Sequence, residues 1–168
     1  LFAPDGKIYG AQAIGKDGVD KRIDVLAVAQ RAGLSVFDLQ DLELTYAPPF
    51  GSAKDVINMA GFVASNHLKG DTLLCHAAEV QARHPHQLVV DVRNGPELDK
   101  LGRIPGALHI PLDELRSRLH ELPRDKELLI SCQVGLRGHV ACRLLSQHGF
   151  RVKNLSGGFK TWQMASAG

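Results

Sequence analysis

Cys132 stands where a predicted strand ends and a predicted helix begins. The run before it, 127–130, is mostly apolar and is typical of a buried strand, whereas the apolar spacing of 140–145 favours a helix. The thiolate is the reactive form of cysteine, and an unperturbed thiol has a pKa of about 8.5. A nucleophilic cysteine therefore needs neighbours that favour its anion.

The turn after Cys132 carries groups that favour a thiolate. Backbone N–H groups and the N-terminus of the following helix present positive partial charge to an anion, and Arg137 adds a permanent cation. Gly135 and Gly138 allow the backbone to curl so that several amides point at one atom. The expected binding loop for a charged sulfur consists of Gln133, Val134, Gly135, Leu136, Arg137 and Gly138.

A single cysteine after an apolar strand is more often a small buried hydrophobe than a nucleophile. For Cys132, the pattern Cys-x-x-Gly-x-Arg between a strand and a helix favours the nucleophile. Cys142 has apolar neighbours on the predicted helix, so we expect it in the core. Cys75 lies near the break between the two halves of the chain, where we expect exposure but no cation or helix start to activate it.

Four motifs in the second half of the chain resemble those of rhodanese-type sulfurtransferases, which carry sulfur as a cysteine persulfide. In chain order they are Asp91-Val92-Arg93, Gly102-Arg103-Ile104-Pro105-Gly106-Ala107, Cys132-Gln133-Val134-Gly135-Leu136-Arg137 and Gly157-Gly158-Phe159-Lys160-Thr161-Trp162. The resemblance covers about residues 72–165. It departs from the family at Arg103, where many members have histidine.

This resemblance implies catalysis by Cys132 in two displacements. Its thiolate would take the outer sulfur of a sulfane donor such as thiosulfate, polysulfide or a low-molecular-weight persulfide, and a low-molecular-weight thiol would then accept that sulfur. Arg137 either binds an anionic donor or braces the loop by pairing with an acid such as Asp91 or Glu97. The residues expected to support the loop are Asp91, Arg93 and Glu97.

Two other functions remain open for this fold. In the related phosphatases and arsenate reductases, five residues separate the cysteine from the arginine. Four residues lie between Cys132 and Arg137. The shorter loop suits a single sulfur atom better than a tetrahedral oxyanion. Rhodanese-like domains without activity also serve as interaction or regulatory modules, although retention of the cysteine argues against that function here.

The composition narrows the choice of function. With 168 residues, of which 44% are hydrophobic, the chain is long enough for a packed core. A net charge of +2 is too small to indicate a nucleic-acid or acidic-membrane partner, and no apolar run is long enough to predict a transmembrane helix. Three widely spaced cysteines and eight scattered histidines form neither a disulfide framework nor a metal-ligand set, which favours the cytoplasm and no bound metal.

The elements that must position the motifs alternate between strand and helix over 71–168. Predicted strands span 87–92, 107–110, 128–131 and 152–155, and predicted helices span 76–83, 112–119 and 138–148. This order favours an α/β, rhodanese-like fold with a mainly parallel sheet and helices on both faces. Asp91 and Cys132 fall at the carboxyl ends of their strands, where the sites of such sheets usually lie.

The preceding segment, 1–70, predicts an incomplete α+β unit. Its predicted elements are strands at 7–14 and 42–46 and helices at 20–33, 35–39 and 55–67. The first helix is expected to be capped by Asp20. The residues expected to be buried on the last helix are Val56, Met59, Ala60 and Val63. This small number of elements needs another surface against which to bury its apolar faces. We therefore expect this segment to be part of a larger protein.

Three stretches of this segment resemble the C-terminal dimerisation domain of pyridine nucleotide–disulfide reductases of the coenzyme A disulfide reductase type. They are Val19-Asp20-Lys21-Arg22-Ile23-Asp24-Val25-Leu26, Tyr46-Ala47-Pro48-Pro49-Phe50-Gly51-Ser52-Ala53-Lys54-Asp55 and Asn58-Met59-Ala60-Gly61. Some members of that family carry a rhodanese domain directly afterwards, which is the order found here. The resemblance implies an intact homodimeric protein that uses FAD, NAD(P)H and coenzyme A and acts on polysulfide, coenzyme A persulfide or disulfide.

The same resemblance implies that Tyr46 reaches the partner subunit's active site and contacts the thiol substrate. From the sequence alone, Tyr46 equally fits the end of a strand before two prolines. No Gly-x-Gly-x-x-Gly turn follows a predicted strand, so this chain has no evident site of its own for FAD or NAD(P)H. We therefore expect the flavin and nucleotide domains to lie outside this sequence.

Overall fold

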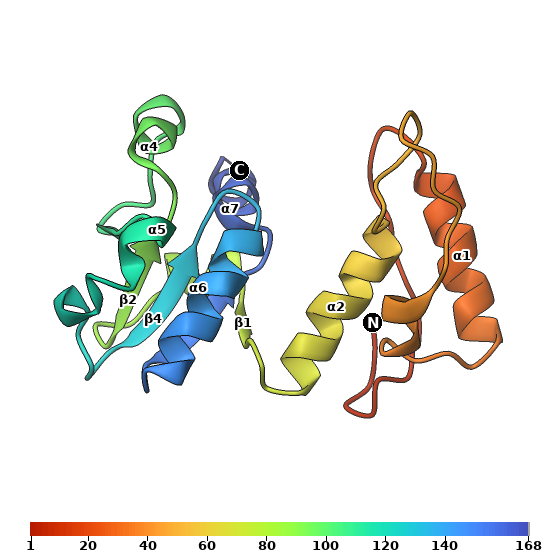
Figure 1. Ribbon diagram of the computed structural model, residues 1–168, viewed down its shortest axis with the longest axis horizontal. Helices are drawn as coiled ribbons and strands as arrows, with labels where there is room; N and C mark the ends of the chain where they lie inside the picture. The colour runs from red at the N-terminus through yellow and green to blue at the C-terminus, as the bar shows by residue number, and fades with distance from the viewer. Residues whose placement is uncertain (168) are drawn as a thin grey trace. The chain divides into compact units, whose positions relative to one another are not determined.

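The computed structural model describes residues 1–167 and divides the chain into two compact units (Figure 1). The first unit is Leu1–Asp71, and the second begins at Thr72. All four motifs around Cys132 lie in the second unit, whose sheet sets their positions.

A five-stranded, fully parallel sheet forms the centre of the second unit. Its strands are β1 (Leu74–Cys75), β2 (Gln87–Asp91), β3 (Leu108–His109), β4 (Glu127–Ser131) and β5 (Arg151–Leu155), in the spatial order β1-β5-β4-β2-β3. Asp91 lies opposite Ser131 in the register of β2 and β4, so the two strands end at the same edge of the sheet. The predicted parallel sheet is thus confirmed, and Cys132 directly follows its middle strand.

Helices cover both faces of this sheet (Figure 1). They are α3 (Ala77–Gln81), α4 (Gly95–Leu101), α5 (Leu112–Leu115), α6 (Leu136–Gln147) and α7 (Gly158–Ser166), with a 3₁₀ turn at Leu119–Glu121. On one face, α5 and α6 pack in the same hydrophobic core as Ile130, and on the other face α3 and α7 pack with Leu129. Neighbouring residues of β4 therefore enter opposite cores, as expected for a strand buried on both sides.

The second unit differs from the sequence-based prediction in several details, among them α5, which ends at Leu115 and not at 119. α6 begins at Leu136, two residues before the predicted start, because Gly135 serves as its N-cap. Cys75 is not exposed but fully buried on β1, a strand of two residues that is too short to show a pattern. The sequence analysis missed α4, a helix of seven residues that begins with a capping box between Asn94 and Glu97.

The first unit packs two helices and a 3₁₀ turn around a small core. These elements are α1 (Val19–Arg31), α2 (Val56–Leu68) and the turn Asp38–Asp41, and the core consists of Ile8, Ala29, Val36, Leu39, Ile57 and Ala64. The N-cap of α1 is Gly18, with φ of +64°, rather than the predicted Asp20. At 13 residues each, α1 and α2 are the longest described helices, and no described helix is long and apolar enough to cross a membrane.

The strands predicted at 7–14 and 42–46 do not form. The described residues of this unit contain only isolated antiparallel bridges. The segment 42–46 has no neighbouring strand, and the side-chain amide of Asn58 donates to the carbonyl oxygen of Leu42 at 3.0 Å instead. Residues that favour strands therefore do not form one here, because no neighbouring strand pairs with them.

The buried face of α2 was predicted wrongly. The residues expected to be buried, Val56, Met59, Ala60 and Val63, are all exposed. The helix instead buries Ile57 and Gly61, and a Cβ added at Gly61 would lie 2.8 Å from the Cβ of Leu39. Close approach of the 3₁₀ turn through a glycine decides the buried face, and apolar spacing alone could not reveal it because both faces carry apolar side chains.

Candidate active site

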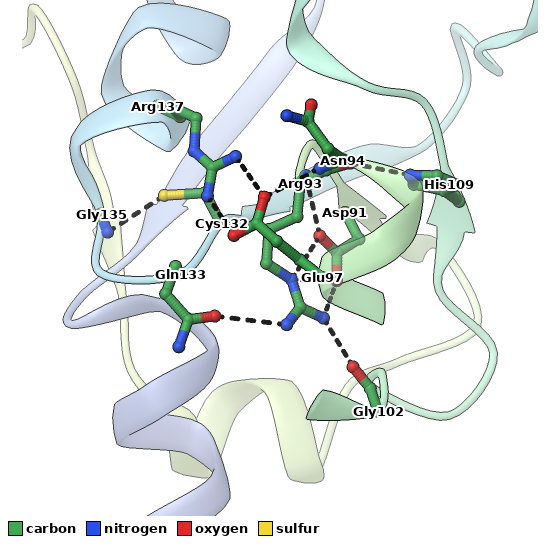
Figure 2. Close-up of polar contacts among 10 residues, drawn as sticks. All are labelled: Asp91, Arg93, Asn94, Glu97, Gly102, His109, Cys132, Gln133, Gly135 and Arg137. Atoms are coloured by element: carbon green, nitrogen blue, oxygen red, sulfur yellow. Dashed lines mark hydrogen bonds and ion pairs between the residues drawn. The ribbon is translucent and has the colours of Figure 1, made fainter. Parts of the chain in front are cut away.

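The thiol of Cys132 is held inside the loop at the carboxyl end of β4. The residue is only 1% exposed, and the N–H of Gly135 donates to its Sγ over an N···S distance of 3.1 Å (Figure 2). β4 pairs with β2 on one side and β5 on the other, so the strand that delivers the cysteine is fixed by two ladders. The sulfur therefore has a defined position and at least one backbone hydrogen-bond donor.

The loop turns into α6 at Gly135. This residue has φ of +112°, a backbone conformation that side chains with a Cβ rarely adopt. Its carbonyl oxygen accepts the N–H of His139 at 2.9 Å, which starts the helical hydrogen bonding. The N–H groups of 136–138 precede that first bond and point toward the end of the helix at which Sγ lies.

Arg137 forms a two-pronged ion pair with Glu97 on α4 (Figure 2). Its Nη1 lies 2.6 Å from Oε2 and its Nη2 lies 2.7 Å from Oε1. Hydrogen bonds from Arg137 lower the pKa of Glu97 to about 2, and the same bonds raise the pKa of Arg137. Of the two functions expected for Arg137, this geometry corresponds to bracing the loop, with Glu97 rather than Asp91 as the acid.

Arg93 lies fully buried beneath the loop and joins all four sequence motifs. Its Nη2 lies 2.7 Å from Oδ2 of Asp91, and both side chains are 0% exposed. The guanidinium also donates to Oε1 of Gln133 at 3.3 Å and to the carbonyl oxygen of Gly102 at 2.9 Å (Figure 2). The ring of Phe159 stacks against it, with the guanidinium carbon 4.0 Å from the ring centroid.

The start of α7 holds the backbone of the cysteine loop. The N–H of Phe159 donates to the carbonyl oxygen of Cys132 at 2.7 Å, and the N–H of Lys160 donates to that of Gln133 at 3.2 Å. Gly158 permits this approach, because a Cβ at that position would overlap the carbonyl oxygen of Cys132. The late Gly-Gly-Phe motif therefore fixes the loop through backbone contacts.

Gly158→Ala is expected to lower the free energy of unfolding by about 2–4 kcal/mol, because the added Cβ meets backbone atoms at a φ of +62°. Gly95→Ala is the matched control, since a Cβ there has no atom within 4 Å, and its effect should stay within about 1 kcal/mol. Urea unfolding of both variants measures the difference. Equal effects of the two substitutions would contradict the proposed close approach.

Glu97→Gln is expected to remove a stabilisation that depends on pH. A carboxyl whose pKa is lowered by folding stabilises the protein above its unfolded pKa, near 4.5, and this contribution is lost as the pH falls toward 2. The wild type should exceed the variant by about 1 kcal/mol at pH 7. Urea unfolding as a function of pH should show the gap closing below pH 4.5, and a gap that stays constant down to pH 3 would refute the assigned ion pair.

The pKa values of the other two cysteines are raised. Cys142 lies on α6 and is 1% exposed in the core, which confirms its predicted place, and burial raises the pKa of its thiol well above the ordinary range. Burial also raises the pKa of Cys75 to about 12. Both thiols therefore stay protonated at neutral pH and are poor nucleophiles.

The remaining loop residues divide by exposure. Val134 and Leu136 are 61% and 63% exposed, whereas Gly138 is buried. The sequence analysis did not anticipate that Phe159 stacks on Arg93, although the motif containing Phe159 was recognised. It also missed His109, whose Nε2 lies 2.8 Å from the carbonyl oxygen of Arg93; no local pattern marks that residue.

Two expectations about ligands concern parts of the chain away from this loop. Tyr46 lies in the first unit and is 51% exposed, and its contact with a thiol substrate stays a prediction. Over residues 1–167, the structure places no group of three or more His, Cys, Asp or Glu side chains that could hold a metal ion.

Comparisons with known proteins agree with this geometry. The family model described as a rhodanese-like domain matches residues 76–165. The coenzyme A disulfide reductase of Staphylococcus aureus is 52% identical over 58 residues, which make up 34% of this chain and 13% of that protein. The chain therefore spans only a small part of this curated relative.

Solved structures extend the likeness over both units. Reduced CoADR-RHD from Bacillus anthracis is 49% identical, with a TM-score of 0.93 over 99% of this chain and 30% of that chain. The NAD-dependent persulfide reductase from A. fulgidus is 38% identical, with a TM-score of 0.75 over 89% of this chain and 26% of that chain. A rhodanese-related protein from Thermoplasma volcanium is 32% identical over 55% of this chain and 92% of its own, with a TM-score of 0.53.

Both resemblances drawn from the sequence motifs are thereby confirmed. The likeness to CoADR-RHD covers nearly the whole chain, and the family match covers strands β2 to β5, the cysteine loop and nearly all of α7. The matched region includes Cys132 and the start of α6. The chain therefore belongs to the rhodanese-like domain family.

Proposed function

We propose that this chain transfers sulfane sulfur through a persulfide on Cys132. The observation that carries the proposal is the position of Sγ, which lies at the start of α6 and accepts the N–H of Gly135 at 3.1 Å. A thiolate at that point gains the partial positive charge of the helix start. The ion pair of Arg137 with Glu97 holds the loop in this shape.

The first displacement forms an S–S bond between Cys132 and the outer sulfur of the donor. The Cys132 thiolate supplies the electron pair, the S–S bond of the donor breaks, and the leaving group departs with its pair as a thiolate, a shorter polysulfide or, from thiosulfate, sulfite. In the second displacement an acceptor thiolate attacks the same outer sulfur and leaves as a persulfide, which returns the Cys132 thiolate. Each step exchanges one S–S bond for another, and ionised thiols need no general base.

The loop supports this chemistry by its size and its donors. Four residues separate Cys132 from Arg137, and the N–H groups of 136–138 are directed toward the helix end beside Sγ. The outer sulfur of a persulfide would accept from these amides. A loop of this length suits one added sulfur atom, which disfavours a phosphatase.

We further infer that the chain is the sulfurtransferase part of a larger NAD(P)H-dependent flavoprotein. Two relatives bear the names coenzyme A disulfide reductase and NAD-dependent persulfide reductase, and the chain spans 13% and 26% of them. Its own residues do not fit FAD or NAD(P)H, because the sequence contains no Gly-x-Gly-x-x-Gly turn to cradle a dinucleotide pyrophosphate. Both cofactors are therefore assigned to domains outside this sequence.

The intact protein would act on polysulfide, coenzyme A persulfide or coenzyme A disulfide, with a low-molecular-weight thiol as sulfur acceptor. The first unit would form part of a homodimer interface, and Tyr46 would contact the thiol substrate in the partner subunit's active site. The three cysteines of the chain are free, which suits the reducing cytoplasm.

A sulfurtransferase assay on the 168-residue chain tests the proposed function. With polysulfide or thiosulfate as donor and cyanide or dithiothreitol as acceptor, we expect repeated turnover and no hydrolysis of a phosphate monoester. A folded chain that transfers no sulfur would instead be an interaction module, and release of phosphate would identify a phosphatase.

A further inference from the structure

Asn154 is a polar residue at a buried position of the sheet. It lies on β5, opposite Leu74 of β1 and Ile130 of β4, and is 6% exposed. Its Nδ2 donates to the carbonyl oxygen of Gly135 at 3.0 Å. Its Oδ1 is buried and has no hydrogen-bond partner among the described residues.

Packing or stability alone does not explain an asparagine here. A buried amide oxygen without a partner destabilises the fold, and an apolar side chain of similar shape would avoid that loss. The carbonyl oxygen of Gly135 does not depend on Asn154 for a partner, because it already accepts the N–H of His139 at 2.9 Å. What the second hydrogen bond adds is a fixed orientation of Gly135.

Gly138 makes room for this contact in the first turn of α6. A Cβ at Gly138 would overlap Oδ1 of Asn154 and lie 3.2 Å from its Cγ. Gly138 has an ordinary φ, so it is required here for space and not for backbone conformation. Gly138 and Asn154 therefore form a matched pair that brings β5 close to the cysteine loop.

We propose that Asn154 is a positioning residue for sulfur transfer, which holds Gly135 so that its N–H stays directed at Sγ of Cys132. Glycine rotates easily about φ and ψ, so outside contacts must fix Gly135, and within residues 1–167 its carbonyl accepts a side-chain hydrogen bond from Asn154. Asn154 itself does not contact the sulfur. The inference rests on the proposed function, because its consequence is faster loading of sulfur onto Cys132.

Asn154→Leu tests the proposal, because it keeps the approximate shape and removes only the hydrogen bond. Hydrogen exchange of the Gly135 amide, followed by NMR, should accelerate about tenfold, and the maximal rate of sulfur loading from polysulfide should fall about tenfold. The donor concentration at half-maximal rate and the melting temperature should stay near those of the wild type. Val152→Ala, which disturbs the same face of β5 without a contact to Gly135, should lower the melting temperature and change neither rate.

A second pair of variants keeps the test valid if Asn154→Leu fails to fold. Gly138→Ala should displace the Asn154 amide and accelerate exchange of the Gly135 amide, and adding Asn154→Ala should restore the melting temperature without restoring slow exchange. Wild-type exchange and loading rates in Asn154→Leu, or losses that only follow the melting temperature, would overturn the positioning function. If the wild type takes up no sulfur, the proposed function fails, whereas the exchange rates still decide whether Asn154 positions Gly135.

Discussion

Cys132→Ser is expected to abolish sulfur transfer, with a loss of more than about a thousandfold. The substitution replaces one atom, but a serine hydroxyl is essentially un-ionised at neutral pH and cannot form the S–S bond of a persulfide. The hydroxyl can still accept the N–H of Gly135, so the fold should be retained and the free energy of unfolding should change by about 1 kcal/mol. Stopped-flow sulfur loading and urea unfolding measure the two effects separately.

Cys75→Ala and Cys142→Ala provide the control for this loss. Both residues are buried core cysteines with raised pKa values, so each variant should lose some stability and keep most of its transfer activity. Residual transfer by Cys132→Ser at a tenth of the wild-type rate or more would show that another thiol carries the sulfur, and the assignment of the nucleophile would be wrong.

Arg93→Met should have the largest effect on stability, about 3–5 kcal/mol. The substitution leaves the carboxylate of Asp91 fully buried without its cation, and it also removes the contacts to Gln133, Gly102 and Phe159. Chemical denaturation measures the loss. The cysteine loop would lose its support from below at the same time, so transfer should fall with stability.

Two variants distinguish a buried ion pair from general loss of an arginine. Arg118→Met removes a partly exposed cation that pairs with Glu114 and Glu121, and it should cost much less stability than Arg93→Met. The double variant Arg93→Met with Asp91→Leu removes both buried charges and should recover much of the lost stability without restoring transfer. A loss below about 1 kcal/mol for Arg93→Met alone would contradict the network that joins the four motifs.

The sequence revealed the second unit well because its signals are local. Each strand is a short apolar run, the strands alternate with helices, and the residues from Cys132 to Arg137 are contiguous. These features set the parallel sheet and place the nucleophile at a strand end. The partners of the two arginines were harder to identify, because Glu97 and Gln133 lie 40 residues from Arg137 and Arg93 respectively.

The support of the loop by Asn154 and Phe159 could not be predicted. Asn154 lies in a predicted strand, and nothing in its neighbourhood distinguishes it from an exposed polar residue, although it contacts Gly135 from 19 positions away. Phe159 belongs to a motif that the sequence shows and it lies in the core, but the motif does not reveal that its ring covers a buried cation. Such contacts depend on tertiary packing and not on local pattern.

The sequence predicted the first unit less well than the second. Both faces of α2 carry apolar residues, so the pattern fits two buried faces. The close approach of Leu39 to Gly61 selects the face that carries Ile57. The predicted strands failed because residues 1–71 supply isolated bridges and no ladder to pair with. Sequence pattern therefore works poorly for a segment with few elements and a small core.

The most direct test of the account is to locate the sulfur after the chain has been incubated with polysulfide. Trypsin separates the three cysteines, since Cys132 falls in 127–137, Cys142 in 138–143 and Cys75 in 70–83. After alkylation of persulfides with iodoacetamide, mass spectrometry should find the mass of one extra sulfur atom on peptide 127–137 alone. Extra sulfur on peptide 70–83 or 138–143 at a comparable level, or none on peptide 127–137, would contradict a persulfide at Cys132.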